Sequence, residues 1–180
     1  MIDLSGGSNT IRLRLFGPWG EEVREVDLEG HEKAHLQLSE LFNVDRLWRG
    51  ALALEGEGIF TGYFTYHAPE SAASLPLAAQ LRSELIVPHV AEDNYWWTGL
   101  ALFNPSHRRA YLVIHAYDSQ GREVAVREMT VEARSKVVFT AASRFPLGTS
   151  WLRLTSSEPL CGLYLFGGPG AEVLSGGLMD

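Results

Sequence analysis

The second half of this chain repeats the first at an offset of about one hundred residues. The clearest match pairs residues 11–16 with residues 112–117, where Ile-Arg-Leu-Arg-Leu-Phe stands opposite Leu-Val-Ile-His-Ala-Tyr. Shorter matches follow in the same order along both halves: Gly20–Val23 with Gly121–Val124, Leu28 and Lys33 with Val131 and Lys136, Leu52–Leu54 with Leu152–Leu154, and Phe60–Tyr63 with Leu160–Leu163. Self-similarity of this kind indicates a structural unit that occurs twice, so a residue in one copy can be compared with its counterpart.

Both copies have the pattern of an all-β fold. Short alternating or β-rich segments recur at roughly eight- to twelve-residue spacing and are separated by Gly, Pro, Asn, Asp and Ser, which is typical of a sandwich or barrel. We predict strands over residues 10–17, 21–28, 32–38, 48–55, 58–67 and 74–80, and again over 110–118, 122–131, 134–141, 150–156, 160–167 and 172–178. The predicted architecture is two related antiparallel β-sandwich domains, residues 1–82 and 83–180.

The second copy has two more predicted strands, over residues 83–90 and 97–103, where the first copy has only residues 1–9. Three explanations stay open: the first domain has fewer strands, the two sandwiches share residues 83–103, or a strand comes from another chain. Because an uncovered sheet edge pairs readily with another strand, we expect a tight contact between the two domains or a homodimer.

The composition predicts a globular protein and argues against several classes of partner. Of the 180 residues 46% are hydrophobic, and the net charge is −7. Nucleic-acid binding needs clustered Lys and Arg, so we expect none. The sequence has no apolar window long enough for a membrane span and no signal-peptide pattern, so we expect either a cytoplasmic protein or a processed or excised piece of a longer one. The single cysteine, Cys161, matches Thr61 and is interpreted as a small strand residue rather than a nucleophile.

One segment matches a zinc motif. Residues 31–35 read His-Glu-Lys-Ala-His, and on a helix His31 and His35 would share one face, bind one zinc and let Glu32 activate water. The segment corresponds to residues 134–138, however, and apolar residues alternate around it as in a strand. In a strand the two histidines would lie about 13 Å apart at ~3.3 Å per residue, too far for one ion. We therefore expect a strand here and no metal or other cofactor.

The best candidate for ligand binding is the aromatic run Tyr95, Trp96 and Trp97 next to Asp93 and Asn94. Aromatic faces stack on sugar rings, and carboxylate or amide oxygens accept hydrogen bonds from hydroxyl groups. The alternative is that Trp97, and Trp96 with it, fills the core or the contact between the domains.

A second aromatic candidate is Trp19, which lies in a predicted turn of the first copy.

Parts of the second copy resemble known proteins. The segments that carry the resemblance are Trp97–Ser106, Ile114–Asp118, Trp151–Ser157 and Gly162–Phe166. They resemble uncharacterised bacterial tandem-repeat β-sandwich proteins and, more distantly over residues 99–178, the sensory rhodopsin transducer family. The resemblance lies in strand patterns, among them a Ser-x-x-Pro corner at residues 156–159, and no functional residue is carried over. It implies a small β-sandwich that oligomerises and docks on a partner or ligand without catalysis.

We therefore expect a non-catalytic binding or assembly module that contacts a protein partner or a second copy of itself. The alternative is a carbohydrate-binding module that uses Tyr95–Trp97, which would require exposed and coplanar rings. A zinc hydrolase at His31 and His35 is the third hypothesis and would require a helix there with a third ligand nearby.

Overall fold

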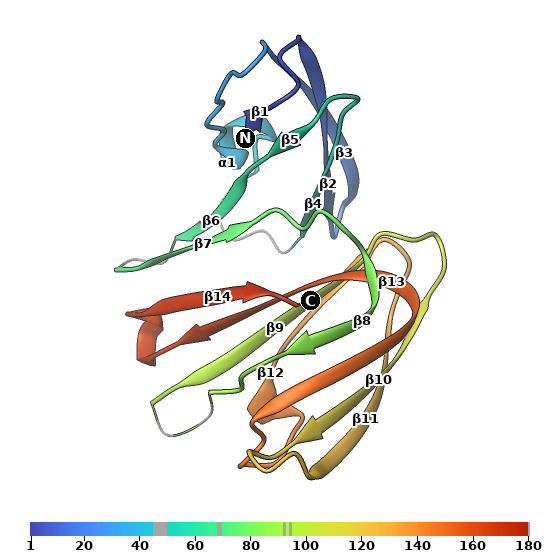
Figure 1. The fold of residues 1–180 in the computed structure, drawn as a ribbon, viewed down its shortest axis with the longest axis vertical. Coiled ribbons are helices and arrows are strands. Elements are labelled where there is room, and N and C mark those ends of the chain that lie inside the picture. The colour runs from blue at the N-terminus through green and yellow to red at the C-terminus, as the bar shows by residue number, and fades with distance from the viewer. Residues whose placement is uncertain (45–49, 68–69, 92, 94, 180) are drawn as a thin grey trace. The chain divides into compact units, whose positions relative to one another are not determined.

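The computed structural model is an all-β protein (Figure 1). The structure describes all residues except 45–49, 68–69, 92, 94 and 180. Strands hold 57% of the residues, and the one α-helix among the described residues has four residues. The predicted all-β class is confirmed.

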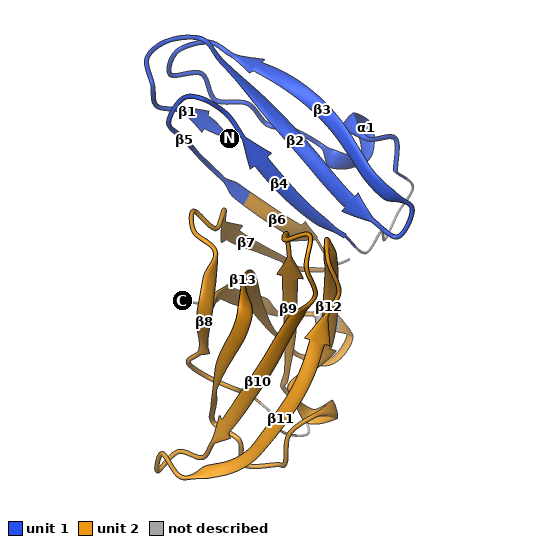
Figure 2. Cartoon of the chain, turned by 90° about the vertical axis from the view of Figure 1, so that its right-hand side faces the viewer, with its two compact units in different colours: residues 1–63 blue, residues 64–180 orange. Residues whose placement is uncertain are grey.

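The chain divides into two compact units, residues 1–63 and 64–180 (Figure 2). The elements that begin in the first unit are β1 (Ile2–Asp3), β2 (Asn9–Gly17), β3 (Gly20–Leu28), α1 (Leu38–Leu41), β4 (Ala51–Glu55), β5 (Phe60–Thr61) and β6 (Tyr63–His67). The second unit adds β7 (Ala72–Pro76), β8 (Arg82–Val87), β9 (Trp97–Asn104), β10 (Ala110–Tyr117), β11 (Glu123–Val131), β12 (Ser135–Thr140), β13 (Trp151–Gly167) and β14 (Leu174–Leu178), with 3-10 turns at Ala141–Ser143 and Pro169–Ala171.

The strand β7 packs beside β14, and both lie in the second unit. The sequence analysis placed residues up to 82 in the first copy. The predicted boundary at residue 82 refers to the sequence repeat and stays a prediction. The boundary at residue 63 separates two units that each pack mainly on themselves.

In the first unit, β2 forms the centre of a three-stranded antiparallel sheet of order β3-β2-β4. Alternation along β2 turns Ile11, Leu13 and Leu15 into the core, where each is at most 1% exposed, while the residues between them face outward. The hairpin between β2 and β3 closes through Gly20, whose φ of 115° lies in a region that favours glycine. The sheet therefore has one buried face and one face of mainly polar residues.

The segment after β3 differs from its predicted strand over residues 32–38. Among these residues only Lys33 forms a β-bridge, to Ile2, and the helical turn α1 begins at Leu38. The cause is the shortness of its neighbour, because β1 has two residues and pairs with the two-residue β5. A segment without a longer strand beside it has no partners for further ladder hydrogen bonds.

In the second unit one strand of 17 residues, β13, organises a seven-stranded sheet. It pairs with β10 and β8 along its first part and with β9 and β14 along its second part. The sheet therefore curves around its core as a half-barrel. Two strands with a corner between them were predicted here, whereas the chain runs on as one strand. Its pairing with β8 is irregular between Thr155 and Leu160, and Pro159, which has no N–H to donate, lies in this irregular stretch.

The core of the second unit draws on both parts of the half-barrel. Leu152 and Leu154 of β13 pack with apolar side chains from β8, β9 and β10, and the largest of these are 2% exposed or less: Leu85, Leu100, Leu102, Leu112 and Ile114. Burial of so many large aliphatic side chains supplies the main driving force for folding of this unit.

A buried carboxylate holds the start of the first unit in place. Asp3 is fully buried, and it accepts hydrogen bonds from the Ser5 hydroxyl at 2.8 Å, the Asn9 amide at 3.2 Å and the His31 backbone N–H at 3.2 Å. Burial raises the pKa of Asp3, but the hydrogen bonds together outweigh this effect and hold the pKa below its ordinary value. The folded chain therefore favours the ionised form.

We predict that Asp3→Asn removes part of the acid sensitivity of the first unit. Because folding lowers the pKa of Asp3, its ionised form stabilises the fold above about pH 4, and this contribution is lost as the pH falls further. Chemical unfolding followed between about pH 5 and pH 2 should show a shallower loss of stability in the variant than in the wild type. An identical pH dependence in both proteins would contradict this assignment.

Candidate functional site

The loop that precedes β9 is built around Asp93. One oxygen of its carboxylate accepts the backbone N–H groups of Tyr95 at 2.7 Å and Trp96 at 2.6 Å. These hydrogen bonds, the one from Trp96 first, hold the pKa of Asp93 below its ordinary value. Asp93 thus fixes the turn of the loop, and its carboxylate binds backbone N–H groups of the same loop. The other polar candidate, Asn94, lies outside the described residues.

Trp97 is a packing residue rather than a free anchor. Its indole N–H donates to the Gly168 carbonyl at 2.9 Å, and its ring lies over Gly167 so closely that a Cβ atom there would overlap the ring. Gly167 pairs directly with Trp97 across β13 and β9. The side chain is half-buried and holds the ends of these two strands together.

Tyr95 and Trp96 are the exposed part of the aromatic run, with 47% and 36% of their surface accessible. Their ring centroids are 5.2 Å apart and their planes meet at 72°, an edge-to-face arrangement. The two rings therefore form no coplanar platform of the kind that the carbohydrate hypothesis requires. An open depression of about 360 Å³ lies beside this loop, bordered by Asp93 and by Leu147, which is 86% exposed.

The remaining predicted residues lie in the first unit. Trp19 is 48% exposed and folds its ring over Gly17 in the hairpin turn. Residues 31–35 are not helical, and His31 has a φ of 65°. The helical spacing on which the zinc hypothesis depends is thus missing. Within the described part of the chain no three His, Cys, Asp or Glu side chains come together as metal ligands.

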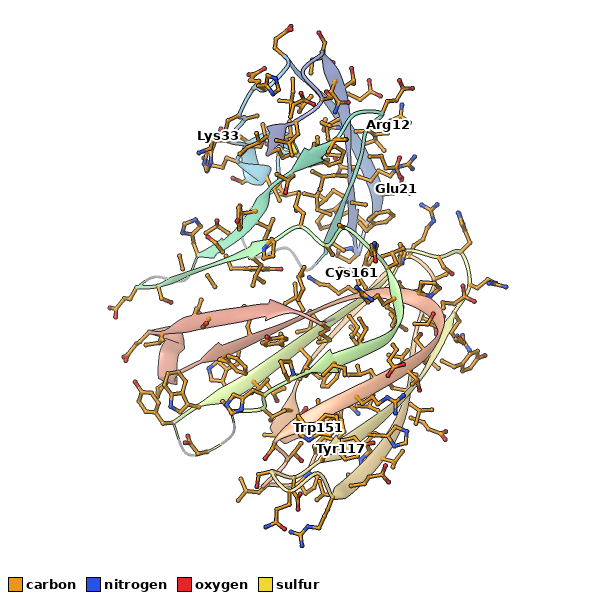
Figure 3. The ribbon with its side chains drawn as sticks, in the orientation of Figure 1. Arg12, Glu21, Lys33, Tyr117, Trp151 and Cys161 are labelled. Atoms are coloured by element: carbon orange, nitrogen blue, oxygen red, sulfur yellow. The ribbon has the colours of Figure 1, made fainter. Side chains whose placement is uncertain are left out.

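The structure brings together an aromatic group that the sequence analysis did not single out. Tyr117 on β10 and Trp151 on β13 are direct cross-strand partners, and their rings stack with centroids 4.0 Å apart and planes 10° from parallel (Figure 3). His115 lies next to Tyr117, with 6.4 Å between the ring centroids, and its Nδ1 lies 2.6 Å from a carboxylate oxygen of Glu123.

These rings belong to the surface of the half-barrel that faces away from the core, which we call the outer face. It is formed by outward side chains of β8, β13, β10 and β11, and its aromatic and aliphatic members are Ile86, Tyr111, Val113, Tyr117, Val124, Val126 and Trp151. Tyr111 is 61% exposed and Val126 is 39% exposed. Arg153 crosses from β13 to Glu84 on β8, with 2.7 Å between nitrogen and oxygen, and adds charge to this apolar surface.

One signal in the sequence could have found the outer face. Strand β10 reads Ala-Tyr-Leu-Val-Ile-His-Ala-Tyr, with apolar or aromatic residues on both faces instead of a strict apolar and polar alternation. An exposed sheet face normally carries polar residues, so this pattern indicates a covered or binding surface.

The matching face of the first unit has a different chemistry. Arg12 pairs with Glu25 at 2.8 Å, and Arg14 lies between Glu21 at 2.6 Å and Glu55 at 3.1 Å. By strand register, Arg12 corresponds to Val113 and Ala51 corresponds to Trp151. An apolar side chain thus replaces the ion-paired Arg12 and a large aromatic one replaces Ala51, whereas His115, at the position of Arg14, contacts the carboxylate of Glu123, and Tyr117 lies at the position of Phe16.

The chain matches no protein-family model, no curated protein sequence and no solved structure. Among the described residues, none of the helices has the length and apolar character needed to cross a membrane.

We predict that Trp97 and Trp96 differ in their effect on stability. Trp97→Phe loses the hydrogen bond to Gly168 and part of the packing on Gly167, so the free energy of unfolding should fall by about 1–2 kcal/mol. Trp96→Phe, at an exposed position, should change it by no more than about 0.5 kcal/mol. Guanidinium titrations of both variants measure the difference, and equal losses would show that Trp97 has no special packing role.

Proposed function

We propose that this chain is a non-catalytic assembly module, built from two copies of one β-sandwich, that binds a second copy of itself through the outer face of the second unit. The observation that carries the proposal is the group of partly exposed aromatic and aliphatic side chains on this face, in which Val113 takes the place of the ion-paired Arg12 and Trp151 takes the place of Ala51.

The copy relationship is supported by backbone details that the sequence match does not contain. The strands β3 and β11 have the same order of exposed, half-buried and buried residues along their nine positions. Two of the three non-glycine residues with positive φ among those the structure describes lie at matched positions, His31 with 65° and Arg134 with 52°; the third is Asn43. Left-handed backbone is uncommon for residues other than glycine, so its recurrence at this point argues for one inherited turn.

A long-range hydrogen bond also recurs. The Arg24 guanidinium donates to the Leu41 carbonyl at 3.2 Å, and the matching Arg127 donates to the Arg144 carbonyl, also at 3.2 Å. Each carbonyl is followed by a buried phenylalanine, which is Phe42 in the first unit and Phe145 in the second. The same anchor therefore ties the second strand of the hairpin to the same helical turn in both units.

The sandwich interpretation rests on the second unit. Strands β8, β13, β10 and β11 form one part of the half-barrel, and β12, β9, β13 and β14 form the other. Side chains of both parts meet in one core. Two sheets packed over a shared core are the arrangement of a β-sandwich, with β13 passing from one sheet to the other.

The outer face has the composition of an interface core. Exposed aromatic residues cost free energy in water and are enriched at the centres of protein interfaces, where Trp and Tyr dominate the binding energy. The stacking of Tyr117 on Trp151 fixes both rings before binding, so little side-chain entropy remains to be lost.

A second copy is the occupant that fits this face. A twofold interface brings the same patch together twice and needs an apolar centre with charges of both signs at its border. Arg153, which pairs with Glu84, and Glu128 place opposite charges on outward positions of β13 and β11, on either side of β10. The resemblance to the sensory rhodopsin transducers agrees with this proposal, because it implies a sandwich that oligomerises.

A binding function fits the titratable groups better than catalysis does. Burial raises the pKa of the Cys161 thiol, which keeps it protonated and a weak nucleophile. The carboxylates of Asp3 and Asp93 accept hydrogen bonds from neighbouring backbone and side-chain groups. Carbohydrate binding at Tyr95 and Trp96 remains an alternative proposal and requires one of these rings to act alone.

We predict that Trp151→Ala, which introduces the residue of the first unit at this position, weakens self-association by about thirtyfold. Val113→Arg, which likewise introduces the residue of the first unit, should place a charge in the apolar centre and act in the same direction. Sedimentation equilibrium over a range of concentrations measures both effects.

The matched control for these variants is Arg12→Ala on the first unit, which should leave the association constant unchanged. A wild-type chain that stays monomeric up to about 100 µM would overturn the proposal. So would a dimer that both Trp151→Ala and Val113→Arg leave intact.

A further inference from the structure

The outer edge of β4 in the first unit is open. Strand β4 pairs with β2 on one side, and within the described residues no strand pairs with its other side. In the second unit the matching stretch of β13 is paired on both sides, with β10 and with β8. An open edge of this kind presents backbone N–H and C=O groups to an incoming strand.

The core behind this edge is also incompletely covered. Leu52 and Leu54 of β4 are half-buried, whereas their counterparts Leu152 and Leu154 are 0% and 1% exposed. In the second unit Leu152 lies opposite Val87, and Leu154 lies opposite Leu85, both on β8. The side chains that β8 supplies are therefore the ones that the first unit lacks.

We infer that the edge of β4 binds an extended segment of another polypeptide, which adds as an antiparallel strand in the place that β8 occupies in the second unit. This recognition mode takes affinity from backbone hydrogen bonds and specificity from alternate side chains. It uses a different surface from the outer face, so it goes beyond the proposed self-association.

The register of β8 on β13 defines the sequence that the edge should accept. The incoming strand needs an apolar side chain of the size of Leu85 opposite Leu54 and one of the size of Val87 opposite Leu52. The single residue between them can be polar or apolar. The next position, which is Glu84 in β8, lies opposite Thr155, and the counterpart of Thr155 in the first unit is Glu55.

Charge complementarity then selects the residue at that position. Glu55 is an exposed carboxylate at the end of β4 that shares the Arg14 guanidinium with Glu21, and Glu57 follows it closely. Residues 1–63 as a whole contain six Lys and Arg against eleven Asp and Glu, a net charge of −5. The segment therefore carries Lys or Arg opposite Glu55. Its four consecutive positions are a basic residue, an apolar residue, any residue and a second apolar residue.

The test is binding of a synthetic peptide to the full chain. The probe has the β8 sequence Arg-Ser-Glu-Leu-Ile-Val with lysine in place of the glutamate and threonine in place of the isoleucine. A control peptide has its apolar residues moved by one position, which turns them to the other face of the strand. We expect saturable binding of the probe, measured by fluorescence anisotropy, and none of the control peptide.

A charge exchange shows whether the peptide lies on β4 in this register. Glu55→Lys should weaken binding of the lysine peptide by about tenfold, and a peptide with glutamate at that position should restore the affinity. Arg14 keeps its ion pair with Glu21 in this variant, and circular dichroism checks the fold. Recovery with the glutamate peptide also shows directly that the variant is folded.

Absence of binding by the lysine peptide would overturn the inference, and so would equal binding of the two peptides to Glu55→Lys. The Trp151→Ala variant should bind the probe with wild-type affinity, because Trp151 lies on the other surface. Failure of strand addition and failure of self-association are therefore separate results.

Discussion

The second unit depends on the pairing of β13 with four other strands. A strand of 17 residues would be long for a flat sheet, and here it passes from one part of the half-barrel to the other. The irregular stretch between Thr155 and Leu160 is where it changes partners, and Pro159 is tolerated there because no regular ladder requires its missing N–H. The buried side chains of β8, β9 and β10 meet in one core because β13 holds these strands around it.

The same strand gives the outer face its rigidity. Trp151 begins β13 and pairs with Tyr117, while Arg153 pairs with His115 two residues further along the ladder. Since both strands are fixed by the core on their inner side, the aromatic rings on the outer side have little freedom to rearrange. Because the apolar side chains cannot rearrange to reduce their contact with water, their exposure costs free energy. Burial against another surface would remove that cost.

Strand positions followed from the sequence because one face of each strand is buried. Alternation predicted β2, β3, β10 and β11 to within a few residues, and the repeat strengthened each assignment. Local pattern could not reveal that residues 151–167 form one strand, since the Ser-x-x-Pro segment has the composition of a turn. It also could not show that residues 32–38 lack a long partner strand, because pairing is a property of the whole sheet.

The candidate site was harder to predict for a related reason. The consecutive aromatic residues Tyr95–Trp97 are conspicuous in the sequence. In the structure, however, the indole N–H of Trp97 donates a hydrogen bond to the Gly168 carbonyl. Tyr117 and Trp151 stand far apart in the chain, and only the pairing of β10 with β13 stacks them. Core-facing positions are apolar in both units because they must pack, so their identity carries no information about function. The outward positions are free to differ, and the proposed self-association rests on the difference between Arg12 and Val113 and between Ala51 and Trp151 at positions of equal strand register.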